Sequence, residues 1–354
     1  MNIININEYN KETSTILTCG TPFHGNSKGS LESLTLDQLD FEVRIQPLLF
    51  QTGVYGSDAT YSHIDKNFYK AVIKYDRKKL TAIPESERPK NDFSEFLTPI
   101  GVVGNKYNLV SNNDLFNSAK QALLTLQAND FDKHSCIFPA SVFDNVEVIE
   151  KPAYKGRFSR FELLFHNLTN EVQQGPNSKT NLKFRICVEN TFNGDGKIRV
   201  TVGFHDEVCS NGLIIGEYTT MTSKHTNGFN LESFMGFISD AVIDSREQVQ
   251  YIQKMADTKL ATKDAEKFLE SVFSERKAKK LTEQFRDESS KRNAYSVWSL
   301  VSALTHYSSH DSENFGVSQH STTQGSNVSD VLSRREREVK AVLDSDKFKE
   351  LLAA

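Results

Sequence analysis

The sequence lacks an apolar run long enough to cross a membrane, and its four cysteines include no Cys-x-x-Cys pair. A membrane-spanning helix needs about 20 consecutive apolar residues, so no membrane partner is expected. Residues 1–15 carry neither a basic segment nor a small-residue cleavage site, which argues against a secretory signal. Widely spaced cysteines indicate reduced thiols, and these absences together predict a cytoplasmic protein.

The sequence also lacks the motifs of the common nucleotide and metal enzymes. It contains no Gly-x-x-x-x-Gly-Lys-[Ser/Thr] loop, no Gly-x-Gly-x-x-Gly after a strand and no His-Glu-x-x-His helix. We therefore expect no cofactor and no enzymatic activity.

Charge is unevenly distributed along the chain. The net charge is only −4, so no overall basic field draws the protein to nucleic acid. Residues 151–199, however, hold nine Lys or Arg against four Asp or Glu, a local excess of +5 that leaves −9 for the remainder. Any attraction to nucleic acid must therefore be local.

Composition and patterning predict a globular α+β protein. Hydrophobic residues make up 38% and charged residues 25% of the chain, which is a globular balance. Strand patterns dominate the central β-meander, and helical patterns follow it. The expected strands are 42–45, 68–75, 146–150, 160–165, 182–189, 197–204 and 213–217, and 100–110 is expected to be a hairpin or a strand with Gly101 and Gly104 at turns. The expected helices are 34–41, 114–126 (capped by Asn113), 231–256, 261–290, 293–308 and 330–352.

The same patterns divide the chain into four parts. An amino-terminal α+β region, 1–140, precedes a core, 141–307, in which helices cover the apolar face of an antiparallel sheet. Residues 308–327 have the composition of a flexible linker. The last part, 328–354, is an amphipathic helix that would dock on its own chain or mediate a homo-oligomer.

The most informative pattern is a pair of strictly alternating segments, 182–189 and 197–204. Successive side chains of a strand point to opposite faces, so eight apolar residues share the core face: Leu182, Phe184, Ile186, Val188, Ile198, Val200, Val202 and Phe204. Four cations share the other face: Lys183, Arg185, Lys197 and Arg199. Apolar residues pair with apolar residues across the hairpin only if the numbers of the two paired residues add up to an even value. This predicts an odd-length turn or a bulge at 190–196, with a glycine at positive φ.

Basic side chains beside aromatic rings on a sheet suit single-stranded DNA, because cations follow phosphates and rings stack on bases. The candidate binding residues are Lys183, Arg185, Lys197 and Arg199, with Arg157 and Arg160 assisting and Tyr154 and Phe158 stacking. The alternative is a solvated outer face kept soluble by its cations, and the pattern alone favours that alternative.

A second cluster, His205, Asp206, Cys209 and His225, offers metal ligands or a thiol nucleophile with its base. Its spacing matches no standard zinc pattern, and no oxyanion motif accompanies it. A metal- or Cys/His-dependent hydrolase is therefore the hypothesis ranked last, and a packed structural cysteine is the simpler interpretation.

Several short motifs of the chain recur in a known group of proteins. They are Pro22-Phe23-His24-Gly25, Lys70-Ala71-Val72-Ile73-Lys74-Tyr75-Asp76, Gly101-Val102-Val103-Gly104-Asn105-Lys106-Tyr107, Val208-Cys209-Ser210-Asn211-Gly212-Leu213 with Lys224-His225-Thr226, and Ala294-Tyr295-Ser296-Val297-Trp298. Through them residues 20–310 resemble a family of phage- and plasmid-like proteins catalogued as a domain of unknown function, although Phe23 stands where the family usually has Trp. The resemblance implies a mobile-element protein of a bacterial host, with no established activity and no catalytic residues to carry over.

The layout, a β-meander leading into helices, is also similar at the level of fold to single-strand annealing proteins of the RecT, Red-beta and Erf type, which are likewise phage-borne. Two functions are thus expected. The first is a DNA-metabolism protein that binds or anneals single-stranded DNA, and the alternative is a non-enzymatic interaction protein that binds a host or defence protein.

Overall fold

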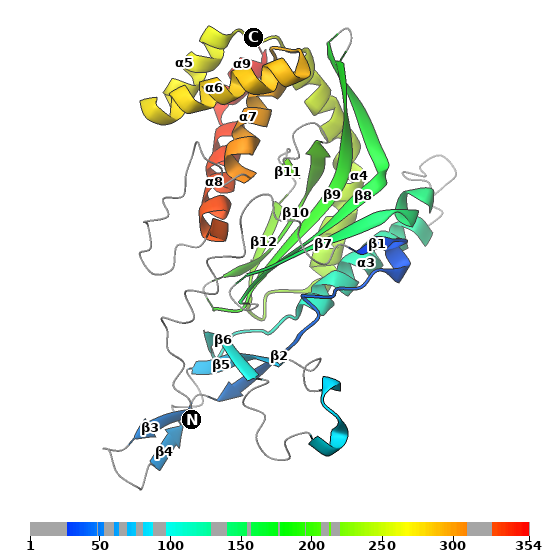
Figure 1. Cartoon of the computed structure of the whole chain (residues 1–354), viewed down its shortest axis with the longest axis vertical. Coiled ribbons are helices and arrows are strands. Elements are labelled where there is room, and N and C mark those ends of the chain that lie inside the picture. Colours follow the sequence, from blue (N-terminus) through cyan, green and yellow to red (C-terminus); the bar gives the residue numbers. More distant parts are fainter. Residues whose placement is uncertain are drawn as a thin grey trace.

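The structure is a computed structural model. The residues that it describes form three antiparallel sheets, with helices along one face and at one end of the largest (Figure 1). The expected α+β class is therefore confirmed. The search for helices long and apolar enough to cross a membrane finds none among the described residues. Those residues are 27–47, 49–52, 60–63, 69–75, 81–87, 97–128, 140–153, 157–175, 178–194, 196–206, 212–213, 220–309 and 328–353.

The large sheet follows the order β1-β7-β8-β9-β10-β11, and β12 also pairs with β10. Its strands are β1 (Ser27–Gly29), β7 (Val146–Ala153), β8 (Phe158–Gly175), β9 (Ser178–Thr191), β10 (Lys197–Asp206), β11 (Gly212–Leu213) and β12 (Thr220–Lys224). The four central strands of the predicted meander are confirmed, and each is longer than its pattern indicated. The strand expected at 213–217 is described only at its first residue, which belongs to β11, and 214–217 lie outside the described residues.

The hairpin of β9 and β10 has the predicted register. Glu189 pairs with Arg199 and Phe184 with Phe204, so the paired numbers have an even sum. Gly194, midway between Glu189 and Arg199, has a φ of +82°, the left-handed conformation that glycine adopts without steric cost. The eight apolar residues assigned to the core face are each at most 2% exposed.

Two small sheets are formed by the chain between β1 and β7, and they lie below the large sheet in Figure 1. One has the order β2-β5-β6 and the other pairs β3 with β4. Their strands are β2 (Glu42–Pro47), β3 (Leu49–Thr52), β4 (Thr60–His63), β5 (Tyr69–Tyr75) and β6 (Leu97–Gly104). The expected strands at 42–45 and 68–75 are confirmed. The segment expected at 100–110 is one strand that ends at Gly104, whose carbonyl accepts a hydrogen bond from Tyr107 N at 3.1 Å.

The helix predicted at 34–41 is wrong. A short 3₁₀ turn, η1 (Leu31–Ser33), is followed by irregular, non-helical chain. The buried carboxylate of Glu150 accepts the backbone N–H groups of Asp37 and Leu39, each at 2.7 Å. A distant acceptor thus satisfies amides that a helix would have bonded internally.

Helices α3 (Asn112–Ala128) and α4 (Leu231–Asp257) pack against each other, and α4 packs on β8 and β10. Their buried side chains belong to the same apolar core as the sheet. Ser111, rather than Asn113, caps α3, because Asp114 N donates to Ser111 Oγ at 3.0 Å and Ser111 N donates to Asp114 Oδ2 at 3.1 Å. This reciprocal arrangement is a capping box.

The remaining helices pack one on the next at the upper end of the molecule in Figure 1 rather than along the sheet. They are α5 (Thr262–Val272), α6 (Glu275–Arg292), α7 (Val297–Ser309), α8 (Val328–Leu343) and α9 (Asp346–Ala353). The predictions of single helices over 261–290 and 330–352 are therefore wrong. The second breaks where Ser345 Oγ accepts from Phe348 N at 3.3 Å and starts α9.

The carboxy-terminal helices dock on their own chain. Glu338 of α8 accepts hydrogen bonds from Lys277 at 2.7 Å and from the Tyr307 hydroxyl at 2.9 Å. Phe348 of α9 packs against Phe268. The first of the two alternatives for this segment is thus observed, while the linker residues 310–327 lie outside the described residues.

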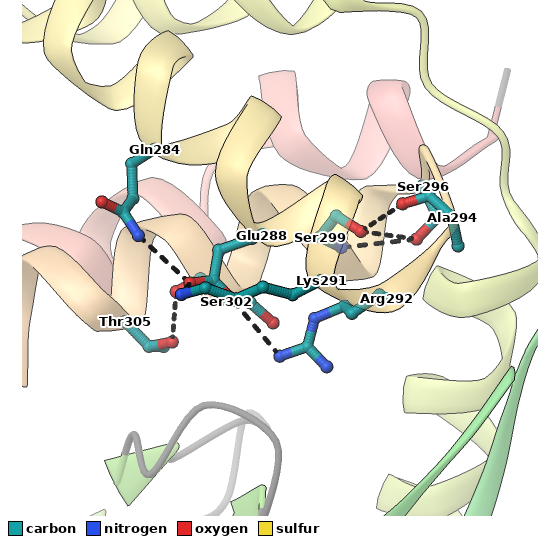
Figure 2. A network of polar contacts seen from close by, with 9 residues as sticks. All are labelled: Gln284, Glu288, Lys291, Arg292, Ala294, Ser296, Ser299, Ser302 and Thr305. Atoms are coloured by element: carbon teal, nitrogen blue, oxygen red, sulfur yellow. Dashed lines mark hydrogen bonds and ion pairs between the residues drawn. The ribbon is translucent and has the colours of Figure 1, made fainter.

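Polar side chains form a network where α6 meets α7 (Figure 2), and Gln174 of β8 joins it. Glu288 is fully buried and accepts from Gln284 at 3.1 Å and from Lys291 at 3.0 Å. Arg292, also buried, lies 3.6 Å from the second Glu288 oxygen. With its amide oriented to satisfy both donors, Gln174 of β8 accepts from Arg292 and from Trp298 at 3.0 Å each. These bonds attach the far end of the β8–β9 hairpin to the helices.

Candidate nucleic-acid interface

Five charged side chains form an ion-pair network on the polar face of β8, β9 and β10. Glu162 accepts from Arg160 Nε at 3.0 Å and lies 2.8 Å from Arg185 Nη2. Glu189 lies 3.2 Å from Arg160 Nη1 and 3.4 Å from Arg199 Nη1. Three arginines against two glutamates leave this ion-pair network with one surplus positive charge.

Strand register produces the ion-pair network. Arg160 on β8 stands opposite Glu189 on β9, which in turn stands opposite Arg199 on β10. Glu162 begins the next row on the same face, opposite Cys187. Opposite charges placed across neighbouring strands stabilise a sheet, so the alternation seen in sequence places acids as well as bases on this face.

The four predicted hairpin cations share one face, as expected, but they are not equally open to solvent. Arg185 is only 4% exposed, and the Arg199 side chain is 22% exposed. Lys183 is half-buried and has partners of its own, whereas Lys197 is exposed. The interpretation of this face as fully solvated is therefore wrong at Arg185, because Glu162 holds Arg185 in a buried ion pair.

Cys187 lies in the middle of the ion-pair network and is 3% exposed. Burial raises the pKa of its thiol to about 12. A thiol rather than a thiolate at neutral pH is a poor nucleophile, so Cys187 fills space on this face.

Exposed cations gather instead where β9 turns into β10. This end of the large sheet is the lower one in Figure 1. We call them the basic rim: Lys106, Arg157, Lys197 and Lys224. All are exposed, and among the described residues none has an ion-pair partner. Lys197 and Lys224 are direct cross-strand partners on β10 and β12.

Backbone hydrogen bonds bring the other two cations of the basic rim to the same end. The carbonyl of Arg157 accepts from Phe192 N, at the start of the hairpin turn, at 2.8 Å. Lys106 occupies the turn from Gly104 to Tyr107. The Tyr107 hydroxyl then donates to the carbonyl of Thr191 at 3.2 Å, which joins this turn to the hairpin.

His225 joins the turn to β12. Its ring stacks on Tyr107 with centroids 4.8 Å apart, and its carbonyl accepts from Asn108 N at 3.0 Å. His225 is 3% exposed, and burial lowers its pKa to about 4. Its ring is therefore neutral at physiological pH, and the positive charge of the basic rim comes from Lys and Arg alone.

A glycine permits the small sheet to approach the hairpin turn. A Cβ atom at Gly101 of β6 would lie 1.8 Å from the carbonyl oxygen of Phe192. Gly194 lies beside Val102 and Val103 in the same contact. Any larger side chain at Gly101 would push β6, and with it Lys106, away from the large sheet.

Of the residues considered for hydrolysis, the structure describes the side chains of His205 and His225, and it places these two far apart. His205 lies at the far end of β10 from Lys197, while His225 follows the partner of Lys197 on β12. At about 3.3 Å per residue, the eight residues from Lys197 to His205 span roughly 26 Å, so the two histidines lie at opposite ends of β10. Within the described residues no group of three or more His, Cys, Asp or Glu side chains is placed to hold a metal ion. Cys209 and the side chain of Asp206 lie outside what is described.

The structure describes only one of the two aromatic residues that the sequence suggested for base stacking. Phe158 is half-buried at the start of β8, and Tyr154 lies outside the described residues. Sequence reasoning missed Lys106 and Lys224. Lys106 lies in a turn. Lys224 ends a strand, Thr-Met-Thr-Ser-Lys, whose polar composition is not typical of a strand. The signal in the sequence for Lys106 was a lysine two residues after Gly104 and next to Tyr107.

A family model described as a domain of unknown function, DUF932, matches residues 159–345. The matched segment begins in β8 and ends just beyond α8, so it includes Lys197 and Lys224 and excludes Lys106 and Arg157. No curated protein and no solved structure matches the chain. Because the family model covers more than half of its 354 residues, the chain belongs to the DUF932 family.

Proposed function

We propose that this protein binds single-stranded DNA through the basic rim. The observation that carries the proposal is the cross-strand pair of Lys197 and Lys224, two exposed cations directly opposite each other. Side chains in such pairs are about 5 Å apart, and like charges there destabilise a sheet. A phosphate between the two ammonium groups removes that repulsion.

The distribution of the basic rim favours a polymer over a single anion. Its four cations come from separate segments: a turn, the approach to β8, and two neighbouring strands. A backbone with regularly repeated phosphates meets all four, and each contact releases counterions. Arg199, with a 22% exposed side chain and a long 3.4 Å contact to Glu189, lies next to Lys197 on the same face and adds a fifth contact.

The buried arginines have another role in this proposal. Arg160 and Arg185 hold the carboxylates of Glu162 and Glu189, so they stiffen the strands that present the basic rim. Lys183 lies near the other end of the same face, opposite His205.

The biological setting belongs to the same proposal. The sequence motifs resemble those of phage- and plasmid-like proteins, and on that resemblance we propose that the protein serves DNA metabolism of a mobile element in the cytoplasm of a bacterial host. Annealing of complementary strands is the corresponding activity. Binding of a host or defence protein is the competing function, and the following experiment separates the two.

Fluorescence anisotropy with labelled oligonucleotides at two salt concentrations tests the proposal. Wild-type protein binds single-stranded DNA, and its affinity falls steeply with salt. The Lys197→Ala/Lys224→Ala variant binds more weakly, and its slope of log K against log salt is shallower by about 1.4, the value for two phosphate contacts on single strands.

The matched control is Lys263→Ala/Lys267→Ala, which removes two exposed lysines from α5, far from the basic rim in Figure 1. It should retain wild-type affinity and slope. Absence of binding to single-stranded DNA, or equal weakening in both double variants, would overturn the proposal and favour a protein partner.

A further inference from the structure

Two large apolar side chains stand open to solvent on the small sheet next to the basic rim. Tyr69 on β5 is 54% exposed and Val102 on β6 is 53% exposed. Tyr69 pairs with Gly104 and Ala71 pairs with Val102, so register places Tyr69 and Val102 on the same face. An aromatic ring and an aliphatic side chain thus form an apolar step.

The other face of this sheet is packed inward. Val72 and Val103 alternate with the exposed pair and are 0% and 2% exposed. Gly101, on that inner face, contacts the hairpin turn at Phe192. The step of Tyr69 and Val102 therefore faces away from the large sheet, and the apolar core leaves it uncovered.

The local geometry leaves the Tyr69 ring accessible. Its cross-strand partner, Gly104, has no side chain to cover it. Gly104 also begins the turn that carries Lys106, an exposed member of the basic rim. Lys106 is thus only two residues along the chain from Gly104, the residue opposite the Tyr69 ring.

We propose that the Tyr69–Val102 step binds an unpaired nucleobase, stacked on the Tyr69 ring, while Lys106 contacts the adjoining phosphate. This inference rests on the proposed function, and it names the feature that selects single strands. Bases of a duplex are stacked on one another and cannot lie on a side chain, whereas every unpaired base has a free face for stacking. The basic rim alone attracts any polyanion.

The test compares three probes by anisotropy: oligothymidine, an oligonucleotide of equal length with an abasic backbone, and duplex DNA. Wild-type protein should prefer oligothymidine to the abasic strand. Tyr69→Ala should weaken oligothymidine binding about tenfold, within the range for loss of one stacked base. It should leave the abasic strand, the duplex and the salt slope unchanged, because no phosphate contact is lost.

Two variants make the result specific to the ring. Tyr69→Phe keeps the aromatic face and should behave as wild type. Tyr295→Ala removes another exposed tyrosine, 48% exposed and located between α6 and α7, and should not alter the preference for bases.

The outcomes separate this inference from the proposed function. If Lys197→Ala/Lys224→Ala weakens every probe while Tyr69→Ala changes nothing, the basic rim binds DNA and the stacking site is refuted. If Tyr69→Ala weakens all three probes equally, the ring supports the fold rather than a base, and the inference also fails. If wild-type protein binds none of the probes, both proposals are wrong.

Discussion

The ion-pair network predicts that Glu162→Gln is severely destabilising. The substitution keeps the size of the side chain and removes the carboxylate shared by Arg160 and Arg185. Arg160 retains Glu189 at 3.2 Å. Arg185, 4% exposed and with Nε already unpaired, loses its ion-pair partner. A buried charge without compensation costs about 3–5 kcal/mol, and this is the expected loss in the free energy of unfolding.

A matched control lies on the same strand. Glu171 of β8 pairs with Lys179, but the two side chains are 55% and 57% exposed. Because water screens exposed pairs, Glu171→Gln should cost about 0–1 kcal/mol. The two substitutions are chemically identical, but Glu162 is buried between two arginines whereas Glu171 is exposed and pairs with one lysine.

Urea unfolding at neutral pH, followed by far-ultraviolet circular dichroism, measures both losses. A third variant, Glu162→Met/Arg185→Met, replaces the buried pair with apolar side chains and leaves Arg160 with Glu189. It should recover more than half of the stability lost in Glu162→Gln, because no unpaired charge remains. Equal losses for Glu162→Gln and Glu171→Gln, within about 0.5 kcal/mol, would refute the reasoning.

Four further substitutions test the packing around the basic rim and α4. Gly101→Ala should lower the thermal midpoint of unfolding, because the new Cβ would lie 1.8 Å from the Phe192 carbonyl oxygen. Gly236→Ala, at an open helical site, should instead stabilise the protein by about 0.5–1 kcal/mol. An unchanged midpoint in Gly101→Ala would contradict the close approach of β6 to the hairpin turn. Burial lowers the pKa of His225 to about 4, below its ordinary 6.5. As pH drops, the unfolded chain therefore binds a proton at His225 before the folded protein does, and the free energy of unfolding should fall by about 2–3 kcal/mol between pH 6.5 and pH 4. Denaturant unfolding measured across this pH range should show the fall in the wild type. An equal fall in His225→Gln would disprove its assignment to His225. Asn230→Ala removes the cap that accepts from the α4 backbone at 2.7 Å and should cost about 1 kcal/mol in chemical denaturation, whereas no loss would show the cap to be dispensable.

The sequence alone determined the hairpin at the centre of the protein. Strict alternation over 182–189 and 197–204 assigned the side chains of these segments of β9 and β10 to their faces, and parity required the odd turn centred on Gly194. Both follow from the two-residue period of a strand, which is local and independent of what packs on the sheet.

Only the tertiary structure decided which cations are open to solvent. Whether Arg185 is free depends on Glu162 of a neighbouring strand, 23 positions earlier in the chain. Likewise, Lys224 belongs to the basic rim only because β12 pairs with β10 and places it opposite Lys197. Burial and ion pairing depend on contacts between residues that are distant in sequence. The local alternation of polar and apolar residues therefore cannot predict them.

The same distinction explains the wrong helix at 34–41 and the missed exposure of Tyr69. The backbone amides of Asp37 and Leu39 find their acceptor in Glu150, more than 100 residues away. Tyr69 is accessible because register gives it a glycine partner, Gly104, on β6. The sequence thus determined which residues alternate on each strand, and long-range pairing determined which of those residues face water, a carboxylate or an open surface.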